Sequence, residues 1–526
     1  MTFPTSSETA CVRRAAGVVA SATFLSRLLG YLRDMTIAWV FGAGLYSDAF
    51  IAAFRIPNLV RRLFGEGAFG MAFIPVFSEI LRRDGKADAC AFTGTTLRYL
   101  WILLVMIVAA SLAFAPQLVR MVAPGFGADA DKFALTLSLT RIMLPYMLIV
   151  GFLALAMGVL NGMGSFAAPA FAPAFLNVAM IGALGAGIML GRDPAAIAMM
   201  LASAVLVGGL LQVALQIPSL RTCGLRFRSG SWKPHPGLMR VGRDILPAVF
   251  GTSVFQINIL IGTLLGSLLG DGSVSYLFFA DRIVQFPLGI FAVSAATASL
   301  PSLSRQADVG DLDGLRRTLE YGMRHVSFVM LPAMVGLVVL REPIVSQLFE
   351  HGAFDREAAR LTAQALLWYA LGIWAVAAIR IISPALFALK DARTPAFAAA
   401  VSLGTQVSLG LLLMRVMGHS GIALSTSVAS IINLLLLLIV MRRRLGRTRV
   451  AASAAVYGHM LGCALLMGGA VRLLSGKLAQ LGGGSVTTSG LLICLTAGVV
   501  VYGGISVVTG SREMRELLSM IYRRGR

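Results

Sequence analysis

The feature that most constrains this chain is a succession of apolar stretches, each long enough to cross a lipid bilayer. A membrane-spanning helix needs about 20 predominantly apolar residues, and only 13% of this chain is charged, against about 25% in soluble domains. We find fourteen such stretches, with approximate cores at residues 15–41, 48–80, 96–115, 136–160, 168–190, 195–217, 244–268, 273–300, 322–340, 361–388, 396–414, 420–441, 453–474 and 488–509. The sequence therefore predicts an all-α polytopic membrane protein with fourteen transmembrane helices, and it excludes a water-soluble enzyme and a disordered chain.

The basic residues between these stretches are unevenly distributed. Lys and Arg number 45 and Asp and Glu number 24, which gives a formal net charge of +21. If the N-terminus is cytoplasmic, most basic loop residues fall on the cytoplasmic side, including the groups within 221–243 and 442–449. This is the bias that the positive-inside rule describes. The pattern predicts that both termini are cytoplasmic, and it accounts for most of the positive charge without a nucleic-acid partner.

The chain also resembles itself at a shift of 226–228 residues. Ser47 matches Ser275, Arg55 matches Arg282, and Pro169-Ala-Phe-Ala matches Pro395-Ala-Phe-Ala. Because the repeated unit holds six helices, an even number, its two copies are expected to be parallel, pseudo-symmetric lobes. Transporters of this design bind substrate between the halves and alternate between inward and outward states. We expect an N-lobe at 1–225, a C-lobe at 226–450, and an appended helix pair with a basic cytoplasmic tail at 451–526.

Several charged residues lie inside the predicted spans, where each costs about 2.5–3.5 kcal/mol near the bilayer centre on insertion scales. The first span carries Ser26 and Arg33 seven residues apart, and therefore on one helical face. The second carries Asp48, Arg55 and Arg62 at intervals of seven. Arg98, Arg141, Arg324 and Arg380 also lie inside predicted spans. The charges that supply the predicted central space, in the first, second and eighth spans, are Arg27, Arg33, Asp34, Asp48, Arg55, Arg61, Arg62, Glu66, Asp281 and Arg282.

These charges have two interpretations. Pairs such as Arg33–Asp34, Arg62–Glu66 and Arg282–Asp281 are close enough in sequence to form internal ion pairs or gate latches. However, this set holds more arginines than acids, and the excess positive charge in a cavity of low dielectric favours an anionic substrate. The guanidinium group presents a planar fork of donors that suits phosphate. The residues therefore predict a phosphorylated or otherwise anionic substrate.

The motifs around these residues resemble a known family. They are Ser26-Arg-Leu-Leu-Gly-Tyr-Leu-Arg-Asp34, Phe41-Gly-Ala-Gly44, Ser47-Asp-Ala-Phe50, Arg55-Ile-Pro-Asn-Leu59, Arg61-Arg-Leu-Phe-Gly-Glu-Gly-Ala-Phe69, Ala123-Pro-Gly-Phe126, Pro169-Ala-Phe-Ala-Pro173 with Leu176-Asn177, and Gly272-Ser-Val-Ser275 through Asp281-Arg282 to Pro287. Together they resemble the lipid II flippase family MurJ/MviN, of the multidrug/oligosaccharidyl-lipid/polysaccharide exporter superfamily. The resemblance covers nearly all of the chain and weakens after about residue 450.

The resemblance implies a multi-pass protein of the bacterial inner membrane that moves lipid II, an undecaprenyl-pyrophosphate-linked disaccharide-pentapeptide, to the outer leaflet for peptidoglycan synthesis. The family's cavity arginines correspond to Arg27, Arg33, Arg61 and Arg282. The residue pattern adds Arg55, Arg62 and Ser26 as substrate-binding candidates, and Asp34, Asp48, Glu66 and Asp281 as gating or ion-pairing candidates. The implied partners are lipid II, membrane lipids and peptidoglycan-synthesis proteins. One departure is Gln285, where some relatives have Glu, and this puts a carboxylate role there in doubt.

Other functions remain open from the sequence. An exporter of another polyprenyl-pyrophosphate-linked glycan would need the same arginines, whereas an exporter of cationic drugs would favour acidic residues in its cavity. An intramembrane transferase is the enzymatic alternative, but the sequence has no HExxH motif, no Walker loop and no paired Cys/His site. We therefore expect a transporter with no metal and no cofactor. The energy source, whether membrane potential, sodium, protons or anion exchange, is left open.

Overall fold

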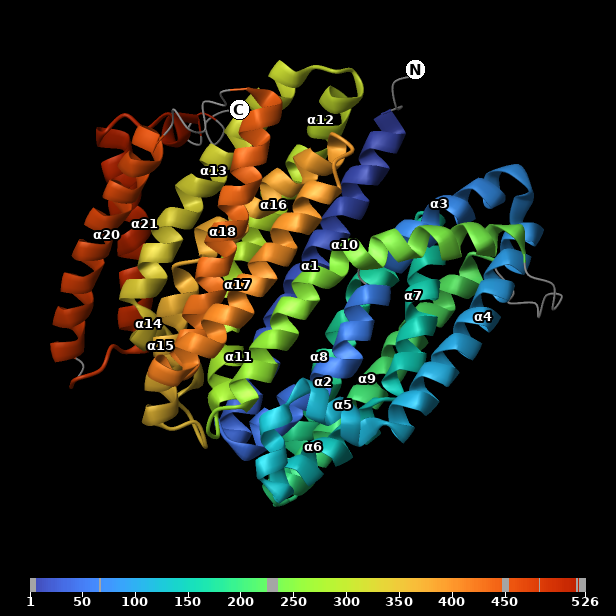
Figure 1. The fold of residues 1–526 in the computed structure, drawn as a ribbon, viewed down its shortest axis with the longest axis horizontal. Helices are drawn as coiled ribbons and strands as arrows, with labels where there is room; N and C mark the ends of the chain where they lie inside the picture. Colours follow the sequence, from blue (N-terminus) through green and yellow to red (C-terminus); the bar gives the residue numbers. More distant parts are fainter. Residues whose placement is uncertain are drawn as a thin grey trace. The chain divides into compact units, whose positions relative to one another are not determined.

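The structure is a computed structural model, and it describes residues 6–65, 68–224, 235–446, 454–481, 483–516 and 519. Throughout these residues the secondary structure is helical, and they contain no β-strand (Figure 1). The chain divides into two compact units, Met1–Ser275 and Tyr276–Arg526. The predicted lobe boundaries at 225/226 and 450/451, and most of the predicted basic tail, lie outside the described residues.

The first unit is built from helices that pack side by side. They are α1 (Ser6–Phe41), α2 (Leu45–Gly65), α3 (Ala68–Arg83), α4 (Gly85–Ala113), α5 (Ala115–Val122), the 3-10 turn η1 (Pro124–Ala128), α6 (Ala130–Met143), α7 (Tyr146–Gly162), α8 (Ala167–Met189), α9 (Pro194–Thr222) and α10 (Pro236–Ser267). Helix α8 packs against both α1 and α9, and α3 packs against α7 and α10. The unit ends with the first residues of α11 (Ser273–Pro287).

Aromatic stacking and close helix packing form the core of the first unit. The rings of Phe73 and Phe92 stack with centroids 5.3 Å apart, and those of Phe73 and Phe77 with centroids 5.6 Å apart. The glycines of α7 make room for them, because a Cβ added at Gly158 would stand 2.8 Å from a Phe73 ring carbon. Small residues allow such close approach between membrane helices.

The second unit contains the rest of α11 and the helices that follow it. They are the π-helical turn η2 (Leu288–Ala292), α12 (Val293–Asp308), α13 (Leu312–Val339), α14 (Arg341–Phe349), α15 (Arg356–Ala370), α16 (Ile373–Ala388), α17 (Arg393–Met417), α18 (His419–Leu445), α20 (Ala454–Leu481) and α21 (Thr488–Val508). Helix α13 packs against α16 and against α20, which in turn packs on α21. The two C-terminal helices therefore share an apolar core with α13.

The helix order of α5–α9 recurs in α14–α18. In each series a short helix is followed by a turn, two helices of middle length and two longer ones. The first middle-length helix is capped in the same way both times: Asp129 accepts from the backbone N–H of Lys132, and Asp355 accepts from that of Ala358. An aspartate at this position satisfies backbone donors that the first helical turn leaves without partners.

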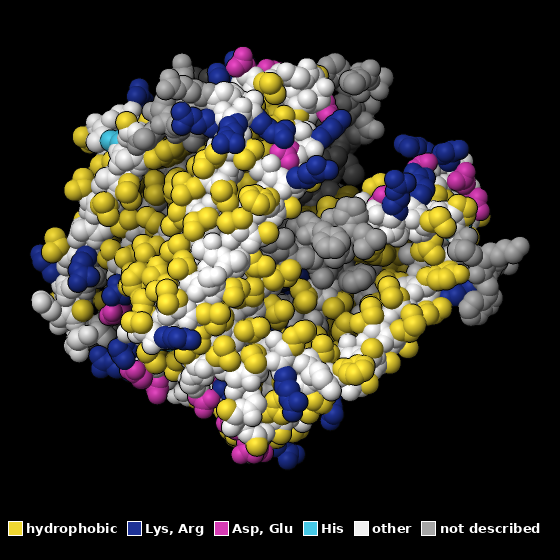
Figure 2. Space-filling view, in the orientation of Figure 1, with side chains coloured by type: hydrophobic (Ala, Val, Ile, Leu, Met, Phe, Trp, Pro, Cys, Tyr) yellow, Lys and Arg dark blue, Asp and Glu magenta, His cyan; other side chains and the backbone are white. Residues whose placement is uncertain are grey.

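The long apolar helices establish that this is a multi-pass membrane protein. Ten helical segments in the described residues are long and apolar enough to span a bilayer, or eleven if the bent pair α15–α16 counts as one span. Each of the fourteen predicted stretches overlaps a helix or consecutive helices. However, α1, α2–α3 and α10 are not among the segments that are long and apolar enough to span a bilayer. In α2 the reason is its charge, because it carries Asp48, Arg55, Arg61 and Arg62 within 21 residues. Hydrophobic side chains cover much of the visible face of each unit (Figure 2).

Candidate functional site

The first group of candidate residues lies between α1 and α8. Arg33 donates from Nε and Nη2 to Asp34 Oδ1, at 2.9 and 2.6 Å, and from Nη1 to Asn177 Oδ1 at 3.0 Å. Asn177 Nδ2 in turn donates to the backbone carbonyl of Ser26 at 3.1 Å. The predicted Arg33–Asp34 ion pair is therefore present, and the Arg33 side chain is only 12% exposed.

Two other candidates on α1 take different positions. Ser26 contributes its backbone carbonyl to this group, so its link to Arg33 runs through Asn177. Arg27 is exposed on the helix surface. Because an α-helix turns about 100° per residue, Arg27 lies on a different face of α1 from Ser26 and Arg33.

The second group lies between α2 and α10. Arg55 Nε donates to Thr263 Oγ1 at 3.0 Å, and Arg62 Nη1 lies 3.5 Å from Gln256 Oε1. The contacts are seven residues apart on both helices, in opposite directions, as expected for antiparallel neighbours. A small pocket between them is lined by Arg55, Asn58, Leu59, Arg62, Gln256, Ile259 and Leu260. Arg55 and Arg62, two of the three charged residues spaced by seven on α2, therefore face α10.

The remaining arginine of α2 is held within its own helix. Arg61 Nε donates to Asn58 Oδ1 at 2.9 Å. Since Asn58 also lines the pocket beside Arg55 and Arg62, the three arginines of α2 approach one region of this unit. Glu66, the predicted partner of Arg62, lies outside the described residues.

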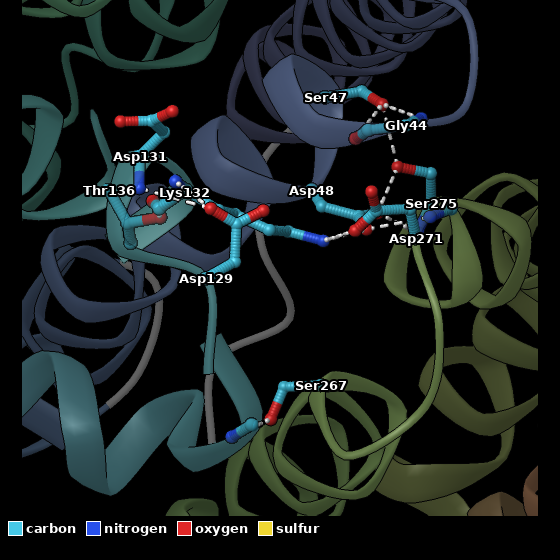
Figure 3. Close-up of polar contacts among 12 residues, drawn as sticks. Gly44, Ser47, Asp48, Asp129, Asp131, Lys132, Thr136, Ser267, Asp271 and Ser275 are labelled. Carbon is cyan, nitrogen blue, oxygen red and sulfur yellow. Dashed lines mark hydrogen bonds and ion pairs between the residues drawn. The ribbon is translucent and has the colours of Figure 1, made fainter. Parts of the chain in front are cut away.

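Asp48 lies at the opposite end of α2, in a buried polar cluster (Figure 3). Its Oδ2 accepts from Lys132 Nζ and from the Gly272 backbone N–H, both at 2.8 Å, and its Oδ1 accepts from the backbone N–H and hydroxyl of Ser275 at 2.9 and 2.6 Å. Ser47 completes the cluster, with its hydroxyl 2.8 Å from that of Ser275. Asp48 is one of the predicted gating or ion-pairing residues, and in this structure its ion-pair partner is Lys132.

Lys132 links the cluster to the α10–α11 loop. Its ammonium group lies 2.7 Å from the carboxylate of the exposed Asp271 and 4.3 Å from the centre of the Phe126 ring. The Lys132 side chain is only 4% exposed. A carboxylate at the N-terminus of α11 also interacts favourably with the helix dipole. The cluster therefore fastens the ends of α2 and α6 to the start of α11.

The candidates of the second unit lie on α11. Asp281 Oδ1 accepts from Gln285 Nε2 at 3.3 Å, one helical turn apart. The guanidinium carbon of Arg282 lies 4.6 Å from the centre of the Phe278 ring, a cation–π geometry. Gln285 therefore acts as a donor to Asp281, which a deprotonated glutamate could not do.

The structure adds residues that the sequence did not single out as site residues. Asn177, Thr263 and Gln256 are neutral side chains on neighbouring helices that hold Arg33, Arg55 and Arg62. For Asn177 a signal existed, because it is the only polar side chain in α8. Lys132 precedes the predicted apolar stretch 136–160, but α6 already begins at Ala130 and includes it.

Within the described residues, no group of three or more His, Cys, Asp or Glu side chains is placed to hold a metal ion. Asp391, at the start of α17, accepts from the backbone N–H of Thr394 at 3.0 Å and from its hydroxyl at 2.7 Å. It also pairs with Arg444 at 2.7 Å. These contacts give Asp391 a structural role at the helix end.

Comparison with known proteins gives a consistent result. A family model described as "Lipid II flippase MurJ" matches residues 37–491. The lipid II flippase MurJ of Burkholderia cenocepacia is 37% identical over 438 residues, covering 82% of this chain and 84% of the relative. The probable lipid II flippase MurJ of Bdellovibrio bacteriovorus is 34% identical over 519 residues, which is 96% of each chain.

Solved structures show the same fold. The structure titled "Lipid II flippase MurJ, inward closed conformation" matches with a TM-score of 0.78 and 26% identity, covering 95% of this chain and 99% of the other. An inward-facing multidrug transporter of the MATE family matches with a TM-score of 0.69 at 16% identity, covering 82% and 99%, and shows the fold alone. The relatives are named as flippases, which are transporters. On this evidence the chain belongs to the family of lipid II flippases named MurJ.

Proposed function

We propose that this protein is a lipid II flippase of the bacterial inner membrane, which moves the lipid-linked peptidoglycan precursor from the cytoplasmic to the outer leaflet. The observation that carries this proposal is Arg33, a nearly buried arginine on a helix of a multi-pass membrane protein. Three of its five N–H groups donate to Asp34 and Asn177, and one N–H on each terminal nitrogen remains to bind a phosphate oxygen.

The other arginines complete the substrate site in this proposal. Arg27, Arg33, Arg61 and Arg282 bind the pyrophosphate, while Arg55, Arg62 and Ser26 line the path of the headgroup. Guanidinium groups suit this task because they stay charged at any physiological pH and match phosphate geometry. The polyprenyl tail stays in the lipid, or in a groove beside the appended helices α20 and α21.

Alternating access supplies the movement, and the acidic residues control it. The Asp48–Lys132–Ser275 cluster stabilises one closed state by holding the start of α11, and it opens when the substrate leaves. Asp34, Asp281 and Glu66 pair with arginines in one state and release them in another. The architecture that we propose has fourteen spans in two six-helix lobes, 1–225 and 226–450, with an appended region 451–526 and both termini cytoplasmic.

The test is complementation in cells depleted of their own flippase. Outer-leaflet lipid II is measured with an enzyme that cleaves only the exposed lipid. We expect this chain to restore cleavage, the variants Arg27→Gln, Arg33→Gln and Arg282→Gln to fail at equal membrane abundance, and the control Arg192→Gln, at an exposed turn, to succeed. A membrane-inserted chain that leaves lipid II inaccessible, or an Arg27 or Arg282 variant with full transport, would contradict the proposal.

A further inference from the structure

We propose that Asn177 is a positioning residue for substrate recognition: its carboxamide aligns the Arg33 guanidinium so that one N–H on each terminal nitrogen is presented to an anionic phosphate group. This inference rests on the proposed function, because it concerns how the same arginine recognises its ligand. Asn177 itself is 94% buried, with only 6% of its surface exposed.

The first argument is the geometry of the carboxamide. Its oxygen accepts from Arg33 Nη1 at 3.0 Å, and its nitrogen donates to the Ser26 carbonyl at 3.1 Å. Ser26 and Arg33 are two helical turns apart on α1, so one side chain of α8 contacts both. Gly30 lies between them, and a Cβ built there would stand 3.7 Å from Asn177 Nδ2. With both ends of the amide engaged, Asn177 has a single orientation and a single direction in which its oxygen points.

The second argument is the division of donors on Arg33. Asp34 accepts two hydrogen bonds from Arg33 on the same carboxylate oxygen, Oδ1: one from Nε and one from Nη2. This pair alone lets the guanidinium pivot about that oxygen. The bond from Nη1 to Asn177 adds a second fixed point on the other side of the group and thereby defines its plane. Fixing a donor before the ligand arrives reduces the entropy lost on binding.

The third argument is the neutrality of Asn177. A carboxylate at this position would form a second ion pair with Arg33 and compete with an incoming phosphate for the same guanidinium. An amide accepts the same hydrogen bond without a formal charge. Asn177 therefore aligns the arginine while leaving its charge available to the substrate.

The experiment uses the full-length protein in lipid nanodiscs and measures the affinity for a polyprenyl pyrophosphate, with the uncharged polyprenol as the comparison ligand. We expect Asn177→Asp to weaken pyrophosphate binding by roughly ten- to a hundredfold, the scale of one charge-assisted hydrogen bond. Its melting temperature without ligand is measured alongside and is expected to fall modestly, because the carboxylate pairs with Arg33 but cannot donate to the Ser26 carbonyl; the loss of pyrophosphate affinity is therefore read from protein that is folded at the assay temperature. Polyprenol binding does not change.

Two further variants separate positioning from a structural role. Asn177→Leu removes both hydrogen bonds and is expected to weaken pyrophosphate binding by several-fold. Gln212→Leu removes another buried amide, on α9, which lies 3.4 Å from the Tyr146 hydroxyl. It is the matched control, and it is expected to leave pyrophosphate affinity unchanged. In an Arg33→Gln background, Asn177→Asp is expected to cause no additional loss, since the residue acts through Arg33.

The outcomes distinguish this inference from the proposed function. If Arg33→Gln loses binding while Asn177→Asp binds as tightly as the unmodified protein, Asn177 does not position Arg33 and the inference is overturned. The same conclusion follows if Asn177→Asp weakens binding equally with and without Arg33. If the unmodified protein binds pyrophosphate no better than polyprenol, the proposed function itself fails, and this inference falls with it.

Discussion

At the scale of single residues, the buried charge of Asp48 is stabilised by a full set of hydrogen-bond partners. The carboxylate of Asp48 accepts four hydrogen bonds, from Lys132, Gly272 and the backbone and hydroxyl of Ser275. Such a network is stable as a complete set, because removing one partner leaves a desolvated charge. Asp48 and Lys132 therefore depend on each other, and their mutational effects should be coupled.

The substitution Lys132→Met should destabilise the protein by roughly 3–5 kcal/mol, the usual cost of leaving one partner of a buried ion pair alone. The double variant Asp48→Asn/Lys132→Met should recover part of this loss, because it removes the uncompensated charge. Thermal or chemical unfolding of the purified protein in detergent measures both. The exposed Lys477 provides the control, and Lys477→Met should change stability by less than about 0.5 kcal/mol. Equal stability of Lys132→Met and the unmodified protein would contradict the coupling.

At the scale of helices, the sequence predicted where the elements lie far better than what they contact. The apolar stretches had to be helical, because the hydrocarbon core offers no hydrogen-bond partners and a helix pairs its own backbone N–H and C=O groups. The Arg33–Asp34 pair could be predicted because the residues are adjacent. Asn177 and Lys132 could not be assigned as partners of Arg33 and Asp48, since those contacts depend on which helices pack together. Helix pairing is set by surface fit, and a single sequence does not reveal it.

Close packing between α3 and α7 makes Gly158 sensitive to a single added methyl group. In Gly158→Ala the new Cβ would stand 2.8 Å from Phe73, so the ring or the helix must move, at a cost of roughly 1–3 kcal/mol. Gly182→Ala is the matched change, because nothing lies within 4 Å of a Cβ at that position. Melting temperatures should fall for Gly158→Ala and stay level or rise for Gly182→Ala. A Gly158→Ala protein as stable as its parent would show that this contact is not tight.

The start of α17 should make stability depend on pH in the acidic range. Hydrogen bonds from Thr394, together with the nearby charge of Arg444, hold the pKa of Asp391 below its ordinary value. A carboxyl whose pKa is depressed on folding stabilises the protein above the unfolded-state pKa of about 3.9, and this contribution is lost as the pH falls through the folded-state pKa. Asp391→Asn should therefore lower the unfolding free energy at pH 7, and the difference from the unmodified protein should shrink below about pH 4. A difference that is constant between pH 7 and pH 3 would contradict this account.

At the scale of the whole molecule, the charges between the helices are expected to determine how the chain sits in the membrane. The last turn of α18 carries Arg442, Arg443 and Arg444 in succession, whereas the turn between α8 and α9 carries the single basic residue Arg192. The positive-inside rule assigns the former to the cytoplasm and the latter to the opposite side. Positions on opposite sides of the membrane are separated by an odd number of spans, and the predicted stretches between Arg192 and Arg443 are odd in number.

Thiol labelling tests this orientation. In a background from which the five native cysteines have been removed, Arg192→Cys should react with a membrane-impermeant maleimide in intact spheroplasts. Arg443→Cys should react only after lysis. Both positions are exposed, so access to the reagent is not limited by packing. Labelling of both residues from the same side would contradict the predicted number of spans between them, and a reversed pattern would contradict the cytoplasmic termini.

The π-helical turn η2 has a consequence for how this protein tolerates insertions and deletions. It follows Pro287 and joins α11 to α12 within one continuous span, Ser273–Asp308. A π-turn holds one residue more than the α-helical turn it replaces, and each residue rotates the helix by about 100°. Loss of one residue within 288–292 would therefore restore an ordinary α-helical turn and leave α12, with the buried Leu303, facing the same neighbours. A deletion in the regular α-helical part of the span would instead rotate everything that follows it, so the π-turn is the place where this span can lose a residue and keep its packing.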